Sequence, residues 1–237
     1  QVPLDAQFVI SAADRQSNAP VFELFQGGRG FSTVMIWVAF FFGLFMVYAL
    51  SSWLTKLLAI AGYSLGSALT FVLVFNAGAI LGAIGGAWLG DRYNIKHVLV
   101  GLYALGAVSL TSMGFVTSSE VLFVMVFIVG ASTLGTQLVA YAYAAAFYPA
   151  AIRSTGVGFA SGVGRAGGIV APIIIGVIVG LQLPLEQNFM AIGLAGYLAG
   201  VGWWGRALWL PLRTKPPREF ASASVGAALP WAVVGLA

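Results

Sequence analysis

The sequence predicts an all-α membrane protein with six transmembrane helices. Of its 237 residues, 60% are hydrophobic and only 8% are charged, whereas soluble domains carry about 25% charged residues. The apolar residues gather in stretches close to the roughly 20 residues that a helix needs to cross a bilayer, and most charges fall between them. The six stretches are 33–58, 67–90, 98–117, 121–147, 156–181 and 189–212.

The residues before the first stretch differ from it in composition. Residues 1–30 are mixed and polar, and Pro and Gly interrupt any long helix there. They lack the apolar core of a signal peptide, so we expect a cytoplasmic linker. The chain then divides into this linker at 1–30, a membrane domain at 31–212 and a cytoplasmic tail at 213–237. The first residue is Gln1, which fits a piece of a longer protein.

Glycine recurs at helical spacing in two of the stretches. In the second stretch every fourth residue is a glycine, at Gly78, Gly82, Gly86 and Gly90. The fifth stretch repeats the pattern around Pro172, at Gly164, Gly168, Gly176 and Gly180. Residues four apart share one helix face, and small residues let neighbouring backbones approach closely. We therefore expect tight packing of both helices, which is compatible with helices that slide or rock against each other.

The sixth stretch is the weakest, because Arg206 interrupts it. We expect this side chain to extend to the membrane surface while the nearby tryptophans lie in the interfacial belt.

The charged residues between the stretches predict the orientation. One side of the membrane receives nine Lys and Arg residues, and the other side receives only Lys56, with Glu120 and Glu186. The nine are Arg15, Arg29, Arg92, Lys96, Arg153, Arg206, Arg213, Lys215 and Arg218. Basic residues concentrate on the cytoplasmic side of membrane proteins, so both ends of the chain are expected in the cytoplasm.

Arg165 is the most informative residue inside a predicted span. It lies nine residues after Gly156, about 14 Å along a helix and near the middle of the membrane. A cation there costs about 2.5–3.5 kcal/mol, so it should face a cavity or a partner. No Asp or Glu lies within the spans to pair with it. We expect Arg165 to serve an anionic ligand or a carboxylate outside this chain; an ion pair or extension to the surface is the alternative.

Polar side chains in two other spans form a second candidate group. Thr133, Gln137 and Tyr141 follow one another at intervals of four and should share a helix face, and Asn76 lies midway along the second span. Such groups either line a polar cavity or bond neighbouring helices together, at about 0.6 kcal/mol each. The sequence leaves both roles open.

Several function classes are excluded by residue type. The chain has no Cys and one His, His97, which lies between two spans, so neither a metal site nor a buried Ser–His pair is supported. There is no basic face for nucleic acid. We expect no enzyme activity, no catalytic residues and no cofactor.

One cluster of charged residues carries a resemblance to a known family. Ala87-Trp88-Leu89-Gly90-Asp91-Arg92-Tyr93-Asn94-Ile95-Lys96-His97 resembles the loop motif Gly-x-Leu-x-Asp-Arg-x-Gly-Arg-Lys of the major facilitator superfamily, in its copy between helices 8 and 9. Ala87 and Asn94 replace two glycines of the motif, and Asn94 is expected to make the turn because Asn tolerates positive φ. Within the superfamily the cluster is similar to the aromatic acid:proton symporters.

Two further segments are similar to the same symporters. The segment from Gly130 to Gln137, continuing to Pro149, resembles their helix 10. The segment from Tyr148 to Arg165 resembles their helix 10–11 turn and helix 11. The resemblance implies helices 7–12, one half of a twelve-helix carrier in the bacterial inner membrane, without the N-terminal half and its proton-coupling acid.

The resemblance also implies a function and its residues. The carrier would bring in an aromatic carboxylate such as benzoate or 4-hydroxybenzoate with protons, by two halves that rock about a central site. Arg165 would attract the carboxylate or balance the missing acid, and Gln137 and Tyr141 would donate hydrogen bonds. A carrier for another organic anion or metabolite, or a non-transporting six-helix subunit, is the alternative.

The charged cluster is expected to act as a gate. Asp91 follows the C-terminal end of its helix, where the helix dipole disfavours an anion. It would instead face the start of the fifth span at Ser154-Thr155-Gly156, with Ser and Thr as N-caps. Arg92, Lys96 and Arg153 either join this gate or only fix the orientation.

Overall fold

The structure is a computed structural model that describes residues 20–116 and 118–209. The predictions for residues 1–19 and for the tail after residue 209 lie outside these described residues. The described part is helical, and its elements are α1 (Pro20–Glu23), α2 (Gly30–Ile60), α3 (Leu65–Arg92), α4 (Ile95–Met113), α5 (Ser119–Gly130), η2 (Ala131–Gly135), α6 (Thr136–Phe147), η3 (Ala150–Ile152), α7 (Arg153–Gly180) and α8 (Leu185–Trp209).

Five of the described helical segments are long and apolar enough to cross a membrane. They are Gly30–Ile60, Leu65–Arg92, Ile95–Met113, Ser119–Phe147 and Ala150–Gly180. They match the first five predicted spans, so the chain is a multi-pass membrane protein. The sixth predicted span begins within α8 and continues beyond Trp209, outside the described residues.

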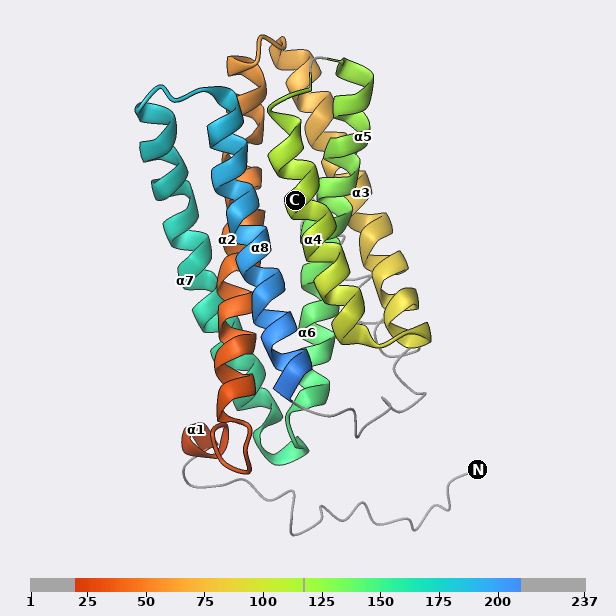
Figure 1. Ribbon diagram of the computed structural model, residues 1–237, viewed down its shortest axis with the longest axis vertical. Coiled ribbons are helices and arrows are strands. Elements are labelled where there is room, and N and C mark those ends of the chain that lie inside the picture. The colour runs from red at the N-terminus through yellow and green to blue at the C-terminus, as the bar shows by residue number, and fades with distance from the viewer. Residues whose placement is uncertain (1–19, 117, 210–237) are drawn as a thin grey trace, which may run out of the picture.

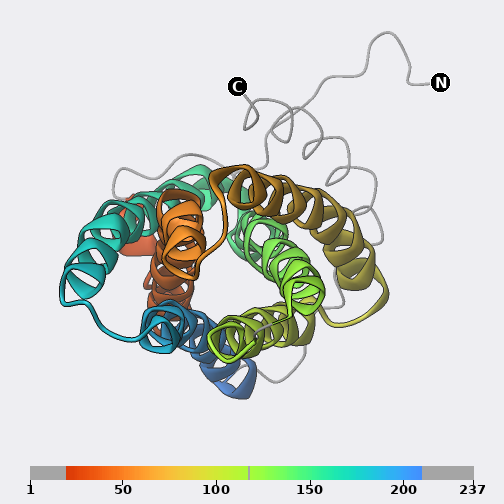
Figure 2. The same cartoon turned by 90° about the horizontal axis from the view of Figure 1, so that it is seen from above.

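The long helices run up and down in an antiparallel bundle (Figure 1). α2 packs against α7 on one side and α8 on the other, and α4 packs against α8. α3 packs against α5 and η2. Viewed along the bundle, α4 and α8 lie together on one side, while α7 and α3 lie at opposite flanks (Figure 2). The sequence connections are short, which favours this antiparallel order of neighbours.

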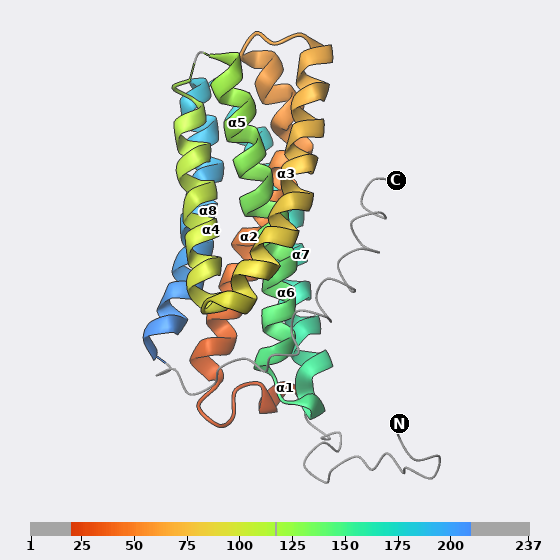
Figure 3. The same cartoon turned by 90° about the vertical axis from the view of Figure 1, so that its right-hand side faces the viewer.

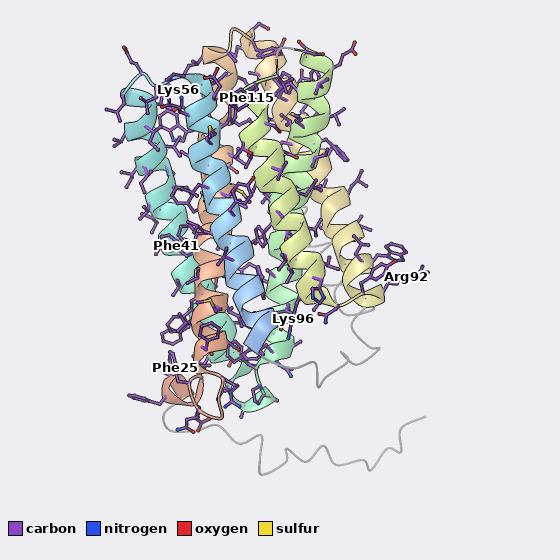
Figure 4. The ribbon with its side chains drawn as sticks, viewed as in Figure 1. Phe25, Phe41, Lys56, Arg92, Lys96 and Phe115 are labelled. Atoms are coloured by element: carbon purple, nitrogen blue, oxygen red, sulfur yellow. The ribbon has the colours of Figure 1, made fainter. Side chains whose placement is uncertain are left out.

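The predicted positive side is one end of the bundle. Arg92 and Lys96 lie at the lower end with Phe25, whereas Lys56 and Phe115 lie at the upper end (Figure 4). The separation follows from the alternating direction of the helices, which also brings the start of α7 to the lower end (Figure 3). The grouping of basic residues at one end is therefore confirmed for these residues.

The glycine face of α3 packs against the fourth span. A Cβ placed on Gly78 would meet the Phe127 carbonyl, and one on Gly82 would meet the backbone of Ala131. On the other side, Gly130 lies against Phe75 and Gly135 lies against Gly82. Glycine from both helices is needed because backbone meets backbone at this crossing. The predicted close approach is confirmed.

The glycine face of α7 packs against α2. A Cβ on Gly164 would meet Leu44, one on Gly168 would meet the Tyr48 ring, and one on Gly176 would lie 3.1 Å from Trp53. Gly180 has no atom within 4 Å, so the contact ends one turn before the helix does. The indole Nε1 of Trp53 donates to the carbonyl of Pro172 at 3.1 Å, which joins the two helices between Gly168 and Gly176.

The turn between α3 and α4 differs from the prediction. Asn94 has φ −68° and ψ 111°, so it is extended and does not use positive φ. Its side chain instead accepts a hydrogen bond from the Lys96 amide at 3.2 Å and caps α4. Because this cap starts α4 at Ile95, the charged cluster occupies two helix ends and not a separate loop.

The start of α7 also differs from the prediction. The helix begins at Arg153, and its N-cap residue Ile152 makes no side-chain capping bond. The short helix η3 runs from Ala150 directly into α7, so Ser154 already lies in the first turn. The expected N-cap role of Ser154 and Thr155 is therefore wrong.

Two consecutive buried hydrogen bonds hold the segment before α2 against the lower end of the bundle. The hydroxyl of Tyr148 donates to Thr33 Oγ1 at 3.4 Å, and Thr33 Oγ1 donates to the carbonyl of Leu24 at 2.8 Å. Thr33 and Leu24 are fully buried. Gly156 leaves room for the Tyr148 ring, which a Cβ there would strike. The entry to α2 is thereby tied to the turn before α7.

Candidate functional site

Arg165 lies in the middle of α7, twelve residues after its first residue, Arg153. Its side chain is exposed on the surface of the bundle. No described residue forms an ion pair or a hydrogen bond with its guanidinium. An ion pair with another helix of the described part, the alternative left open by the sequence, is therefore not formed in this structure.

Tyr141 lies on α6 beside the same helix. Its hydroxyl and Ser161 Oγ on α7 are 3.1 Å apart, and either can donate. The Phe40 ring on α2 meets the Tyr141 ring edge to face, with centroids 4.8 Å apart at 89°. Tyr141 and Ser161 are both half-buried. Three helices thus hold a hydroxyl pair close to the surface that carries Arg165.

Gln137 is one turn before Tyr141 on α6 but lies in the interior. It is 5% exposed, and its Oε1 accepts a hydrogen bond of 2.9 Å from the hydroxyl of Tyr103 on α4. Its Nε2 has no partner among the described residues. Gly43 on α2 makes room for the pair, since a Cβ there would lie 2.6 Å from both oxygens. Gln137 and Tyr141 therefore share a face, as predicted, and it is turned toward α2.

The hydroxyl of Thr133 is bound within its own helical segment. Thr133 lies in η2, a π-helical segment between α5 and α6, and its hydroxyl donates to the carbonyl of Val129 at 2.7 Å. The side chain is fully buried.

Asn76 is bound to its own helix. Its Nδ2 donates to the carbonyl of Val72 at 2.8 Å, and the side chain is half-buried. α3, which carries it, does not pack against α7. The structure therefore brings Tyr141 close to the helix of Arg165, and it does not bring Asn76 there.

The four predicted gating residues lie at the lower end of the bundle in two places. Asp91 and Arg92 are exposed at the end of α3, and Lys96 is half-buried at the start of α4. The Arg92 guanidinium lies over the Trp88 ring, 5.6 Å from its centroid. Arg153 is exposed at the start of α7. In this structure the carboxylate of Asp91 is not joined to the start of α7.

Three residues that contact Tyr141 or Gln137 were not predicted as site residues. Ser161, Tyr103 and Gly43 meet their partners through tertiary contacts, and only Ser161 carried a sequence signal, its position one turn before Arg165. The described residues contain no group of three His, Cys, Asp or Glu side chains that could hold a metal ion.

Comparison with known proteins gives the family. The model of the Major Facilitator Superfamily matches residues 36–234. The benzoate transport protein of Acinetobacter baylyi is 44% identical over 195 residues, which cover 82% of this chain and 42% of that protein.

Two further relatives are similar over much of the chain. The gentisate transporter of Corynebacterium glutamicum is 36% identical over 172 residues, 71% of this chain and 38% of the relative. The 4-hydroxybenzoate transporter of Pseudomonas putida is 35% identical over 180 residues, which cover 76% of this chain and 40% of the relative.

The chain spans about two-fifths of the length of these curated relatives. Their names all refer to the transport of aromatic acids, and none describes an enzyme. The helices, the apolar spans and the family match agree, and the chain belongs to the Major Facilitator Superfamily, a family of membrane transporters.

Proposed function

We propose that the chain is the C-terminal half, helices 7–12, of a proton-coupled symporter for an aromatic carboxylate such as benzoate or 4-hydroxybenzoate. The relatives that it resembles are transporters of benzoate, gentisate and 4-hydroxybenzoate, and it covers about two-fifths of each. The carrier would lie in the bacterial inner membrane, with both ends of this half in the cytoplasm.

The observation that carries the proposal is the position of Arg165. An exposed guanidinium at mid-membrane depth is costly unless it faces a cavity or an anion. A substrate carboxylate supplies such an anion and can accept two hydrogen bonds from the planar guanidinium. α7 would thus supply the guanidinium that binds the substrate carboxylate, while the N-terminal half encloses the substrate from the opposite side.

The transport cycle would follow alternating access. Sites in such carriers lie near the bilayer midplane between two repeats, and the halves rock around them. The spans of this half hold no Asp or Glu, so the proton-coupling acid would come from the N-terminal half. Arg165 would either bind the substrate directly or balance that acid.

The gating residues remain part of the proposal. Asp91 at the end of α3 would latch onto another helix when the cytoplasmic side closes, and Arg92, Lys96 and Arg153 would support the closed state. Asp91 is exposed and joined to no described residue, which leaves its carboxylate available for a partner that approaches during the cycle.

Uptake of labelled 4-hydroxybenzoate by the full-length carrier tests the proposal. Arg165→Ala should reduce uptake at low substrate concentration by about tenfold or more, the size expected for a hydrogen bond to a charged group. Arg165→Lys should retain part of it, because the charge stays but the planar fork is lost. Lys56→Ala, which removes an exposed cation at the other end of the bundle, is the matched control. Unimpaired uptake with Arg165→Ala would refute the proposal.

A further inference from the structure

We propose that Ser161 is a ligand-binding residue, and that the hydroxyl pair of Tyr141 and Ser161 binds the same carboxylate as Arg165. This inference rests on the proposed function and extends it. It assigns the recognition of one chemical group, the carboxylate, to three side chains from α6 and α7.

The first support is the geometry of the hydroxyl pair. The two oxygens are 3.1 Å apart, so one hydroxyl donates to the other. The accepting hydroxyl still carries its own hydrogen, which it can donate to a further acceptor. Both residues are half-buried, and the Phe40 ring packs against the Tyr141 ring. The remaining hydrogen can therefore be donated to a ligand that reaches the pair.

The second support is the register of α7. Ser161 and Arg165 are four residues apart, which is about 6 Å along the axis and about 40° around it. Side chains of a helix lean toward its N-terminus and over the residues three and four positions before them. This lean favours an Arg165 side chain that reaches the turn holding Ser161. A carboxylate there can accept from the guanidinium with one oxygen and from the hydroxyl pair with the other.

The third support is the bare surface beside these groups. A Cβ placed on Gly158 or Gly162 would meet no atom within 4 Å, and both glycines are exposed. By contrast, Gly164 and Gly168 on the inner side of α7 are packed against α2. The surface next to Arg165 and Ser161 can thus receive the body of an aromatic ligand.

The test is transport by the full-length carrier with benzoate and with 4-hydroxybenzoate, each labelled. KM and Vmax are measured for Ser161→Ala, Tyr141→Phe and Ser161→Thr, with carrier abundance in the membrane measured alongside. Ser161→Ala should raise KM by about tenfold or more for both substrates equally, because both carry the carboxylate and a hydrogen bond to a charged group is lost. Ser161→Thr should restore KM because it keeps the hydroxyl. Ser52→Ala, at an exposed serine on α2, is the control for serine removal.

Two results would overturn the inference. If Ser161→Ala raises KM for 4-hydroxybenzoate only, the pair recognises the ring hydroxyl and not the carboxylate. If KM stays unchanged while Vmax or abundance falls, the pair only holds α6 against α7.

Failure of the proposed function is separable from failure of this inference. If the wild-type carrier takes up neither aromatic acid but transports another carboxylate, the substrate class is wrong. The same variants are then measured with that carboxylate, and competition by its uncharged amide is compared with competition by the acid. Loss of the preference for the acid in Ser161→Ala would still support the carboxylate role, and an unchanged preference would refute it.

Discussion

Replacing Tyr103 with Phe tests the interior polar contact of this half most directly. The substitution removes only the hydroxyl that donates to Gln137 Oε1 at 2.9 Å. Tyr103 is fully buried and Gln137 is 5% exposed, so water does not replace the lost donor easily. Since Gln137 Nε2 already lacks a partner, the whole amide would become unpaired.

The expected loss of stability lies between two limits. Leaving a buried polar group unpaired costs about 1–3 kcal/mol in soluble proteins. In membrane proteins, interhelical hydrogen bonds average about 0.6 kcal/mol because the unfolded helices also find partners. The Tyr103 contact lies inside the bundle and leaves both ends of an amide unpaired, so we expect about 1–2 kcal/mol for Tyr103→Phe, within the range for buried groups.

A double-mutant cycle with Gln137→Met isolates the contact. The near-isosteric Met removes the amide with its unpaired Nε2, so the single change should cost less than Tyr103→Phe. The double variant leaves neither the hydroxyl nor the amide unpaired, so it should cost less than Tyr103→Phe alone, and the coupling should be about 1 kcal/mol or more. The measurement is the unfolding of the full-length carrier by sodium dodecyl sulfate in mixed micelles, followed by tryptophan fluorescence.

Additive effects would refute this reasoning. Independent sites add within about 0.3–0.5 kcal/mol, so a sum within that margin would mean that the hydroxyl and the amide do not stabilise each other. A rise of KM in Tyr103→Phe without loss of stability would instead place the pair in the substrate site.

Three further changes probe packing, the segment before α2 and the gate. Gly82→Ala should sharply reduce folded carrier, because the new Cβ meets the η2 backbone and overpacking costs about 1–3 kcal/mol or more. Gly85→Ala, where no atom lies within 4 Å, is the matched control, and equal abundance of the two variants would contradict the packing argument. Thr33→Val should increase trypsin cleavage after Arg29, because the buried hydroxyl that binds the preceding segment is lost. Thr33→Ser keeps the hydroxyl and should not increase cleavage. Equal cleavage of both variants would show that the hydroxyl does not hold this segment in place. Asp91→Asn should increase the labelling of cysteines introduced at the cytoplasmic face and should slow uptake. Unchanged labelling and unchanged uptake would exclude the latch.

Much of the fold follows from local sequence properties. Five predicted spans match helical segments because the length and apolarity of a stretch decide whether it can cross a bilayer. The glycine faces of α3 and α7 were predictable because residues four apart share a face. The positive φ predicted at Asn94 is not used because its side chain caps α4 from an extended backbone. The N-cap predicted at Ser154 was wrong because η3 runs directly into α7, which begins at Arg153.

The candidate site was predictable only in part. Arg165 stands out by its charge in an apolar span, and its side chain is exposed on the surface of the bundle. Spacing predicts that Thr133 shares a face with Gln137 and Tyr141, but spacing does not reveal that the Thr133 hydroxyl is bound to the Val129 carbonyl. Ser161 lies one turn before Arg165 in the sequence, but its pairing with Tyr141 comes from a tertiary contact that the sequence does not show.

The sequence by itself determined the membrane class, the positions of five spans and the family resemblance, because these depend on composition, period and short motifs. Only the tertiary structure decided which polar groups meet. Tyr103 and Gln137 are 34 residues apart in the chain, and Tyr141 and Ser161 are 20 apart. Such pairs depend on how helices rotate and pack against one another, and no local pattern records that rotation.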